Sequence, residues 1–214
     1  MAIAVTTPKG SSDTREAILD ATDRLLAQRG FRHVTMEDIG REAGVSRRTV
    51  YMYFPTKQDV GLSSIDRVVE GAQQRLREIA AASGDPADLL RDILVERVLF
   101  RVESIRDYRQ SLDELFEAVR PAYMERRRRH FAREAEIIAG VLAAGRERGR
   151  FDVADPMAAA MTLVQATNAF LPYSLSVEEL GDRALIEAGI RRMADLLLRG
   201  LTGGERRPGK GGSH

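Results

Sequence analysis

The sequence contains no cysteine and no tryptophan, and only 6% of its 214 residues are aromatic. Without cysteine there is no disulfide framework, no thiolate metal site and no cysteine nucleophile, which suits a cytosolic protein. No apolar run approaches the roughly 18 residues that a membrane-spanning helix needs. The opening MAIAVTTPKGSSD lacks the charged start and long apolar core of a signal peptide. We therefore expect a cytoplasmic protein with no membrane partner.

Lysine is also scarce. It occurs only at positions 9, 57 and 210, which leaves arginine for 30 of the 33 basic residues. This bias is typical of GC-rich coding and points to a bacterial source. The net charge is only +1, so the total says little about a nucleic-acid partner. Between Arg41 and Lys57, however, four cations accompany the single acid Glu42, so this short stretch is clearly basic.

Apolar residues recur at helical spacing along most of the chain, and no alternating strand pattern occurs. The sequence therefore predicts an all-α fold of about nine helices. Four of them precede the SGDP break at 83–86, with ends marked by residues such as Gly30 and Pro55. The remaining five are expected over residues 86–107, 111–119, 121–148, 155–171 and 182–200.

The second and third predicted helices share one pattern of boundary residues. Thr35 caps the second, Asp38 follows three positions later, and Val34 and Ile39 are spaced as a hydrophobic staple. Gly44 is the expected C-terminal stop of that helix.

The same pattern repeats at once in the third helix. Val45 precedes the cap, Ser46 is the cap, and Val50 is the staple partner, while Pro55 ends the helix. Two capped helices joined by AGVS have to turn sharply, which predicts a helix-turn-helix.

The third helix places its polar residues on the side opposite Val50 and Phe54, which are expected to be buried. That outer side consists of Arg48, Thr49 and Met52, flanked by Arg47 and Tyr51. A purely structural helix favours acids at its start, because the helix dipole disfavours cations there. The pair Arg47-Arg48 is therefore explained best by an anion opposite it. The alternative is a surface helix with a solvated pair of charges.

In a DNA-binding helix-turn-helix, the N-terminal residues of the second helix meet base edges in the major groove. An arginine fork can pair guanine O6 and N7, and backbone amides at helix caps suit phosphate oxygens. We therefore predict an interface with a double-stranded DNA operator. It comprises Thr35, Ser46, Arg47, Arg48, Thr49, Tyr51, Met52, Tyr53 and Lys57.

The stretch FRHVTMEDIGREAGVSRRTVYMYFPTKQDV resembles the N-terminal signature of TetR-family transcriptional regulators. The family pattern is close to G-V-S-x-x-T-(L/V)-Y-x-(H/Y)-F-x-x-K, and Met52 departs from the aromatic residue common at its position. The matching residues are Gly44, Val45, Ser46, Thr49, Val50, Tyr51, Tyr53, Phe54 and Lys57. The resemblance covers about residues 13–60.

The resemblance implies a homodimer on a two-fold symmetric operator, usually a repressor that a small molecule releases. It also implies dimerisation through the last two long helices, about 155–171 and 182–200. We accordingly expect an N-terminal arm at 1–12, a DNA-binding domain at 13–60, a ligand-binding and dimerisation domain at 61–202, and a tail at 203–214. The arm and the tail are expected to be disordered.

The two C-terminal helices are rich in alanine and glycine, so close helix packing in a dimer or within one chain would each explain them. An effector pocket needs apolar walls with a few polar groups. The predicted ligand-binding residues are Phe100, Phe116, Tyr123, Met161, Gln165 and Asn168. The alternative for each is an ordinary core or backbone-satisfying role.

Enzyme motifs are missing from the sequence. The glycines and lysine of GERRPGKG at 204–211 have phosphate-loop spacing, but no Ser or Thr follows and no strand precedes. The run RRRRH at 126–130 is expected to be a solvated helix face in which Glu125, Glu134 or Glu136 pairs with some of the arginines. We expect no enzyme, no cofactor and no metal site. Two other classes stay open: an all-α interaction module with an architectural helix-turn-helix, and an α-helical enzyme using His33 or His130.

Overall fold

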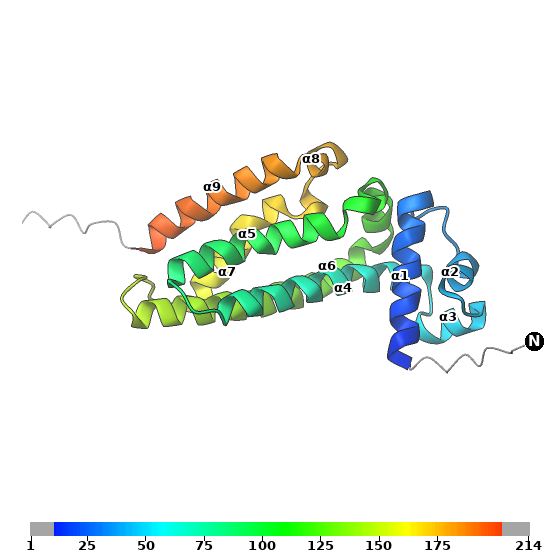
Figure 1. Ribbon diagram of the computed structural model, residues 1–214, viewed down its shortest axis with the longest axis horizontal. Coiled ribbons are helices and arrows are strands. Elements are labelled where there is room, and N and C mark those ends of the chain that lie inside the picture. The colour runs from blue at the N-terminus through cyan, green and yellow to red at the C-terminus, as the bar shows by residue number, and fades with distance from the viewer. Residues whose placement is uncertain (1–10, 203–214) are drawn as a thin grey trace, which may run out of the picture. The chain divides into compact units, whose positions relative to one another are not determined.

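The computed structural model describes residues 11–202, and all of its regular structure in that range is helical (Figure 1). This confirms the predicted all-α fold of about nine helices. The predicted arm and tail, with the GERRPGKG stretch, fall on residues outside this range except for residues 11 and 12, which are helical. The elements are α1 (Ser11–Arg29), α2 (Met36–Ala43), α3 (Arg47–Tyr53), α4 (Lys57–Ala80), α5 (Pro86–Ser104), η1 (Arg106–Ser111), α6 (Leu112–Glu147), α7 (Pro156–Thr167), η2 (Asn168–Phe170), η3 (Pro172–Ser174), α8 (Val177–Gly181) and α9 (Arg183–Leu201).

The chain folds into two compact units, and α4 and α6 contribute residues to both. The first unit comprises Met1–Arg67 and Asp107–Met124. Its core forms where α1 packs on α2 and α2 packs on α3. Buried side chains from these helices and from the start of α4 fill it, and they include Ile18, Leu25, Ile39, Val50, Phe54 and Val60.

The second unit comprises Val68–Arg106 and Glu125–His214. In it α5 runs alongside α9, and both contact α7 (Figure 1). Its core draws on α4, α5, α6, α7 and α9, with buried residues such as Leu76, Leu90, Leu142, Leu163 and Leu198.

Several helix boundaries differ from the prediction. The break expected at Pro121 is wrong, because α6 continues through it as one helix of 36 residues. Proline removes a single backbone donor, and its expected acceptor, the carbonyl of Glu117, belongs to an exposed residue that water can reach. The short helix α8 was not expected, yet Ser176 and Glu179 form a capping box at its start. In residues 11–202 no helix is long and apolar enough to cross a bilayer.

Candidate nucleic-acid interface

The predicted caps of α2 are present. The Thr35 hydroxyl accepts from the Asp38 amide at 3.1 Å, and the Asp38 carboxylate accepts from the Thr35 amide at 3.1 Å. Hydrogen bonds from Thr35 lower the pKa of Asp38. Gly44 ends the helix with φ of 70°, a left-handed conformation that glycine adopts without strain.

The turn between α2 and α3 is tight because a glycine occupies its inner side. A Cβ atom at the buried Gly40 would lie 3.0 Å from the Val45 carbonyl oxygen and 3.3 Å from the Arg47 amide nitrogen. The Val45 amide donates to the Gly40 carbonyl at 2.8 Å. The start of α3 is therefore held directly against α2.

The short helix α3 is anchored at both ends. The Ser46 hydroxyl accepts from the Thr49 amide at 3.0 Å, which caps the start. Val50 and Phe54 are buried in the first unit's core, with exposed fractions of 0% and 3%. These anchors fix which side of the helix faces outward.

The outward side carries the predicted set. Met52 is 76% exposed and Tyr51 is 41% exposed, while Arg47 and Arg48 are also exposed. The Arg47 guanidinium lies 5.4 Å from the centre of the Tyr51 ring, and the Tyr51 hydroxyl raises the pKa of Arg47. Exposed apolar area of this kind beside cations is typical of a contact surface rather than a solvated one.

Neither Arg47 nor Arg48 forms an ion pair with any of residues 11–202. Elsewhere on the same unit exposed arginines have partners, such as Arg24 with Glu42 at 2.7 Å. The two cations at the start of α3 therefore have no ion-pair partner among residues 11–202, at the end where the helix dipole is also positive, although the more distant charge of Glu37 acts on Arg47. This combination can bind an anion.

Three other predicted residues are partly engaged. Thr49 is half-buried and its hydroxyl lies 2.8 Å from that of Ser46, while Tyr53 is half-buried and packs against the core. Thr35 is exposed, but its amide and hydroxyl both donate to Asp38, so other amides of the first turn of α2 would have to meet a phosphate.

The Lys57 side chain is held in place and is not a mobile charge. Its Nζ donates to the Phe31 carbonyl at 2.9 Å and lies 4.6 Å from the centre of the Phe31 ring. Burial lowers the pKa of Lys57, and the charge of Glu114 opposes that shift. The carboxylate of Glu114 also accepts from the Arg32 amide at 3.0 Å. Lys57 and Glu114 thus hold the loop between α1 and α2.

The six predicted ligand-binding residues fall into two groups. Phe116 and Tyr123 are in the first unit, with ring centres 5.3 Å apart. In the second unit, Phe100 and Met161 are half-buried, Gln165 is exposed, and Asn168 accepts from Arg97 at 2.8 Å. Residues 11–202 contain no cluster of His, Asp and Glu suited to a metal ion.

The prediction that Glu134 lies on a solvated face beside the RRRRH run is wrong. This carboxylate is fully buried and pairs with Arg97 at 2.6 Å and with Arg101, both on α5. Sequence reasoning did not identify Arg97 or Arg101 and gave Glu134 a different role. A signal was available, because Arg97 and Arg101 share one helical face with the buried Leu90 and Leu94.

Two family models match the chain. Residues 18–61 match "Bacterial regulatory proteins, tetR family", and residues 86–188 match "Tetracyclin repressor-like, C-terminal domain". The HTH-type transcriptional regulator EthR of Mycobacterium tuberculosis is 40% identical over 87 residues, which is 40% of this chain and 39% of EthR. The match to this curated relative thus spans about two-fifths of its length.

Solved structures match over more of the chain. A transcriptional regulator of the TetR/AcrR family from Thermobifida fusca is 25% identical with a TM-score of 0.63, covering 88% of this chain and 98% of that one. NalD, described as the secondary repressor of the MexAB-OprM multidrug efflux pump in Pseudomonas aeruginosa, is 25% identical with a TM-score of 0.59. The match covers 90% of this chain and 98% of NalD.

Proposed function

Since the chain belongs to the TetR family of bacterial transcriptional regulators and not to an enzyme family, we propose that it is a cytoplasmic repressor. It acts as a homodimer on a palindromic DNA operator, and a small-molecule effector releases it. The observation that carries the DNA-binding part is the exposed pair Arg47-Arg48, which forms no ion pair with any of residues 11–202, on the outward side of a doubly anchored helix.

Arg48 is the residue proposed to read a base. It is exposed on the same side as Met52, next to the capped end of α3 that would enter a major groove. Arg47, stacked on Tyr51, is proposed to meet the phosphate backbone with Ser46. Thr35, Thr49, Tyr53 and Lys57 are proposed as further contacts, with Lys57 keeping its bond to the Phe31 carbonyl.

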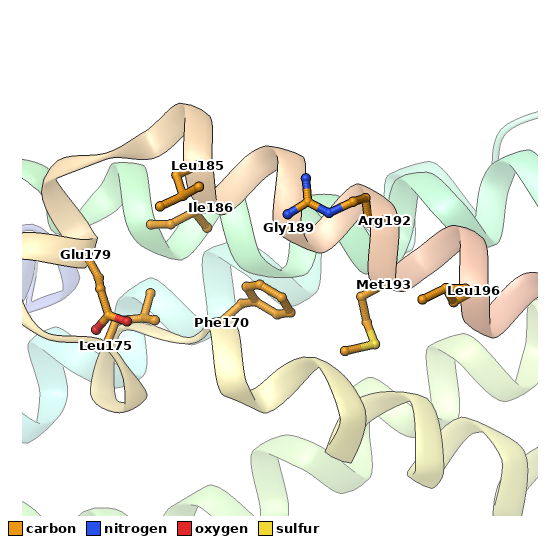
Figure 2. Close-up of a pocket in the computed structure, with 9 residues that line it drawn as sticks. All are labelled: Phe170, Leu175, Glu179, Leu185, Ile186, Gly189, Arg192, Met193 and Leu196. Carbon is orange, nitrogen blue, oxygen red and sulfur yellow. The ribbon is translucent and has the colours of Figure 1, made fainter.

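An apolar stripe on α9 supports the homodimer. Leu185 is 59% exposed and Leu196 is 64% exposed, and both line a hollow of about 390 Å³ (Figure 2). Figure 2 shows further α9 side chains along the same hollow, with Phe170 and Leu175 on its other wall. A contiguous apolar surface of this kind is costly to leave in water, and a second copy of α7 and α9 would cover it.

The repressor and effector parts rest on the family and on its relatives. NalD is named as a repressor, and a repressor that responds to a small molecule needs a second domain besides its DNA-binding unit. The second unit, with its C-terminal family match, is that domain in this proposal. Its proposed ligand contacts include Phe100, Met161, Gln165 and Asn168.

The test is selection of bound fragments from genomic DNA, followed by sequencing. We expect sites with two-fold symmetry and half-sites about one or two helical turns apart. Arg48→Ala should weaken binding to the selected site by about 1–3 kcal/mol and leave non-specific DNA binding nearly unchanged. Arg128→Ala, which removes an exposed arginine from α6, is the charge-matched control.

Dimerisation is tested by light scattering after size-exclusion chromatography. Leu196→Glu should yield a monomer, whereas Met124→Glu, at an exposed methionine of the first unit, should not. Two outcomes would favour an interaction module with an architectural helix-turn-helix. In the first, the wild-type protein retains no DNA fragment. In the second, Arg48→Ala and Arg128→Ala weaken the binding of all fragments equally.

A further inference from the structure

The second unit buries two arginines around one carboxylate. Arg97 and Glu134 have no exposed surface, and Arg101 is 5% exposed. The Arg97 Nε donates to Glu134 at 2.6 Å, its Nη1 donates to the Thr167 hydroxyl at 2.8 Å, and Arg101 bonds the other oxygen of Glu134. We call Arg97, Arg101 and Glu134 the buried ion cluster.

The buried ion cluster carries an excess positive charge. One carboxylate faces two guanidinium groups, and neither arginine pairs with another carboxylate of residues 11–202. A buried charge is costly unless it is paired and hydrogen-bonded. Thr167 and Asn168 end α7, whose C-terminal dipole offsets at most about half a charge.

A third guanidinium increases this excess. Arg127 on α6 lies 5.1 Å from the centre of the Phe131 ring, and Arg97 lies 5.3 Å from the centre of the same ring. Arg127 also stacks on Tyr173 at 5.2 Å and pairs with no carboxylate in the described range. Two guanidinium groups therefore lie against the Phe131 ring, and the Arg127 guanidinium also lies against the Tyr173 ring.

The Arg97 guanidinium has spare hydrogen-bonding capacity. It offers five N–H donors, and three acceptors are present: Glu134, Thr167 and Asn168. The contact with Asn168 is to a neutral amide oxygen at 2.8 Å, on a half-buried residue where α7 gives way to the short 3-10 turns η2 and η3. Such turns have poorer hydrogen-bond geometry than an α-helix, so we expect the cluster to open on this side first.

We propose that the effector is an organic carboxylate, and that its anionic group binds Arg97 and Arg127 beside Asn168 and supplies the missing negative charge. The planar guanidinium fork matches a carboxylate in a bidentate manner. The Phe131 and Tyr173 rings provide an apolar surface for the body of the molecule. This inference rests on the proposed function, because it names the chemical class of the effector.

The first test supplies the carboxylate from the chain itself. Asn168→Asp places it where the amide oxygen already lies 2.8 Å from Arg97, and should raise Tm by about 3–6 °C. Gln110→Glu makes the same change from amide to carboxylate at an exposed residue of the first unit and should leave Tm unchanged. Equal Tm values for Asn168→Asp and wild type, or a lower value for the variant, would overturn the charge excess on which the inference depends.

The second test uses benzoate and hexanoate as probes on the full chain, with benzamide and hexanamide as neutral matches. A carboxylate at about a hundred times its Kd should raise Tm by on the order of 5–10 °C, and the amides should have no effect. The response should disappear in Asn168→Asp and weaken at least tenfold in Arg127→Gln. Equal responses to acids and amides, or a response to inorganic phosphate alone, would overturn the carboxylate assignment.

The two proposals fail separately. If DNA fragments are retained but no carboxylate shifts Tm, the effector inference is wrong and the DNA-binding function stands. If carboxylates bind but the wild-type protein retains no DNA, the proposed function is wrong while the anion site stands.

Discussion

The two units of this protein each contain a pair of arginines, and they treat the pair in opposite ways. Arg47 and Arg48 at the start of α3 are exposed and have no acidic partner within the described residues. Arg97 and Arg101 on α5 are buried and share Glu134. In the first unit the two cations face solvent, where a partner can reach them, whereas in the second unit they are hydrogen-bonded inside the protein.

This difference shows that burial decides whether a cation contributes mainly to the stability of the fold or mainly to binding. Exposed guanidinium groups cost the fold little, so their removal should change binding rather than stability. Buried ones depend on their counter-charge, so removing that partner should change stability first. The following predictions test this division, beginning with the largest expected effect.

Glu134→Gln should lower the free energy of unfolding by about 3–5 kcal/mol, because it leaves two buried guanidinium groups without their anion. Chemical denaturation measures the loss. Glu187→Gln is the control, since Glu187 pairs with Arg183 and Arg191 on the surface of α9 and its loss should lie within the error of the measurement. An equal loss of unfolding free energy in the two variants would contradict the proposed difference between buried and exposed ion pairs.

The difference between wild type and Glu134→Gln should depend on pH. Burial raises the pKa of Glu134, but Arg101 and Arg97 outweigh this and hold the pKa below its ordinary value of 4.5. The carboxylate therefore contributes stability above pH 4.5, and this contribution is lost as the pH falls through the folded-state pKa. Denaturation at a series of pH values should show the two proteins converging in acid, and a gap that stays constant would contradict the assignment.

Gly40→Val should cost about 1–3 kcal/mol, because its side chain would collide with the Val45 carbonyl and Val50 in the turn. Unlike the loss of Glu134, this change should also abolish operator binding, since it moves the start of α3. Gly140→Val is the control, because a Cβ there meets no atom within 4 Å. Thermal denaturation and DNA retention are measured together, and retained operator binding in Gly40→Val would show that the turn tolerates displacement.

Ser46→Ala should cost about 1 kcal/mol through the lost cap of α3. The same loss at Ser176, the cap of α8, is the matched change in the second unit. Only Ser46→Ala should weaken DNA binding at an unchanged temperature well below Tm. A similar weakening in Ser176→Ala would mean that the cap matters through global stability alone.

The helix-turn-helix could be predicted from the sequence because its determinants are local. Thr35 and Asp38, or Ser46 and Thr49, are three positions apart, so their pairing follows from the helix geometry alone. The outward position of Met52 and the burial of Val50 follow from the helical repeat once the caps fix where α3 starts.

The engaged state of Lys57 and the buried ion cluster could not be predicted, because both depend on contacts between distant segments. The acceptor of Lys57 is a carbonyl 26 residues earlier, and Arg97 reaches partners 37 and 70 residues later. The predicted helix break at Pro121 was wrong for another reason. The rule that proline ends a helix is a tendency, and an exposed helix of sufficient length can lose one hydrogen bond and continue.

The near-absence of lysine has a chemical consequence for the surface of α3. Within residues 11–202 the single lysine, Lys57, is half-buried and bonded to the Phe31 carbonyl, so every other side-chain cation there except histidine is a guanidinium. A guanidinium keeps its proton at any pH a cell experiences and is not a substrate for acetyl transfer to amines. Operator binding through α3 would thus be insensitive to acetylation and to alkaline pH. Any regulation of that binding would have to act on another part of the chain.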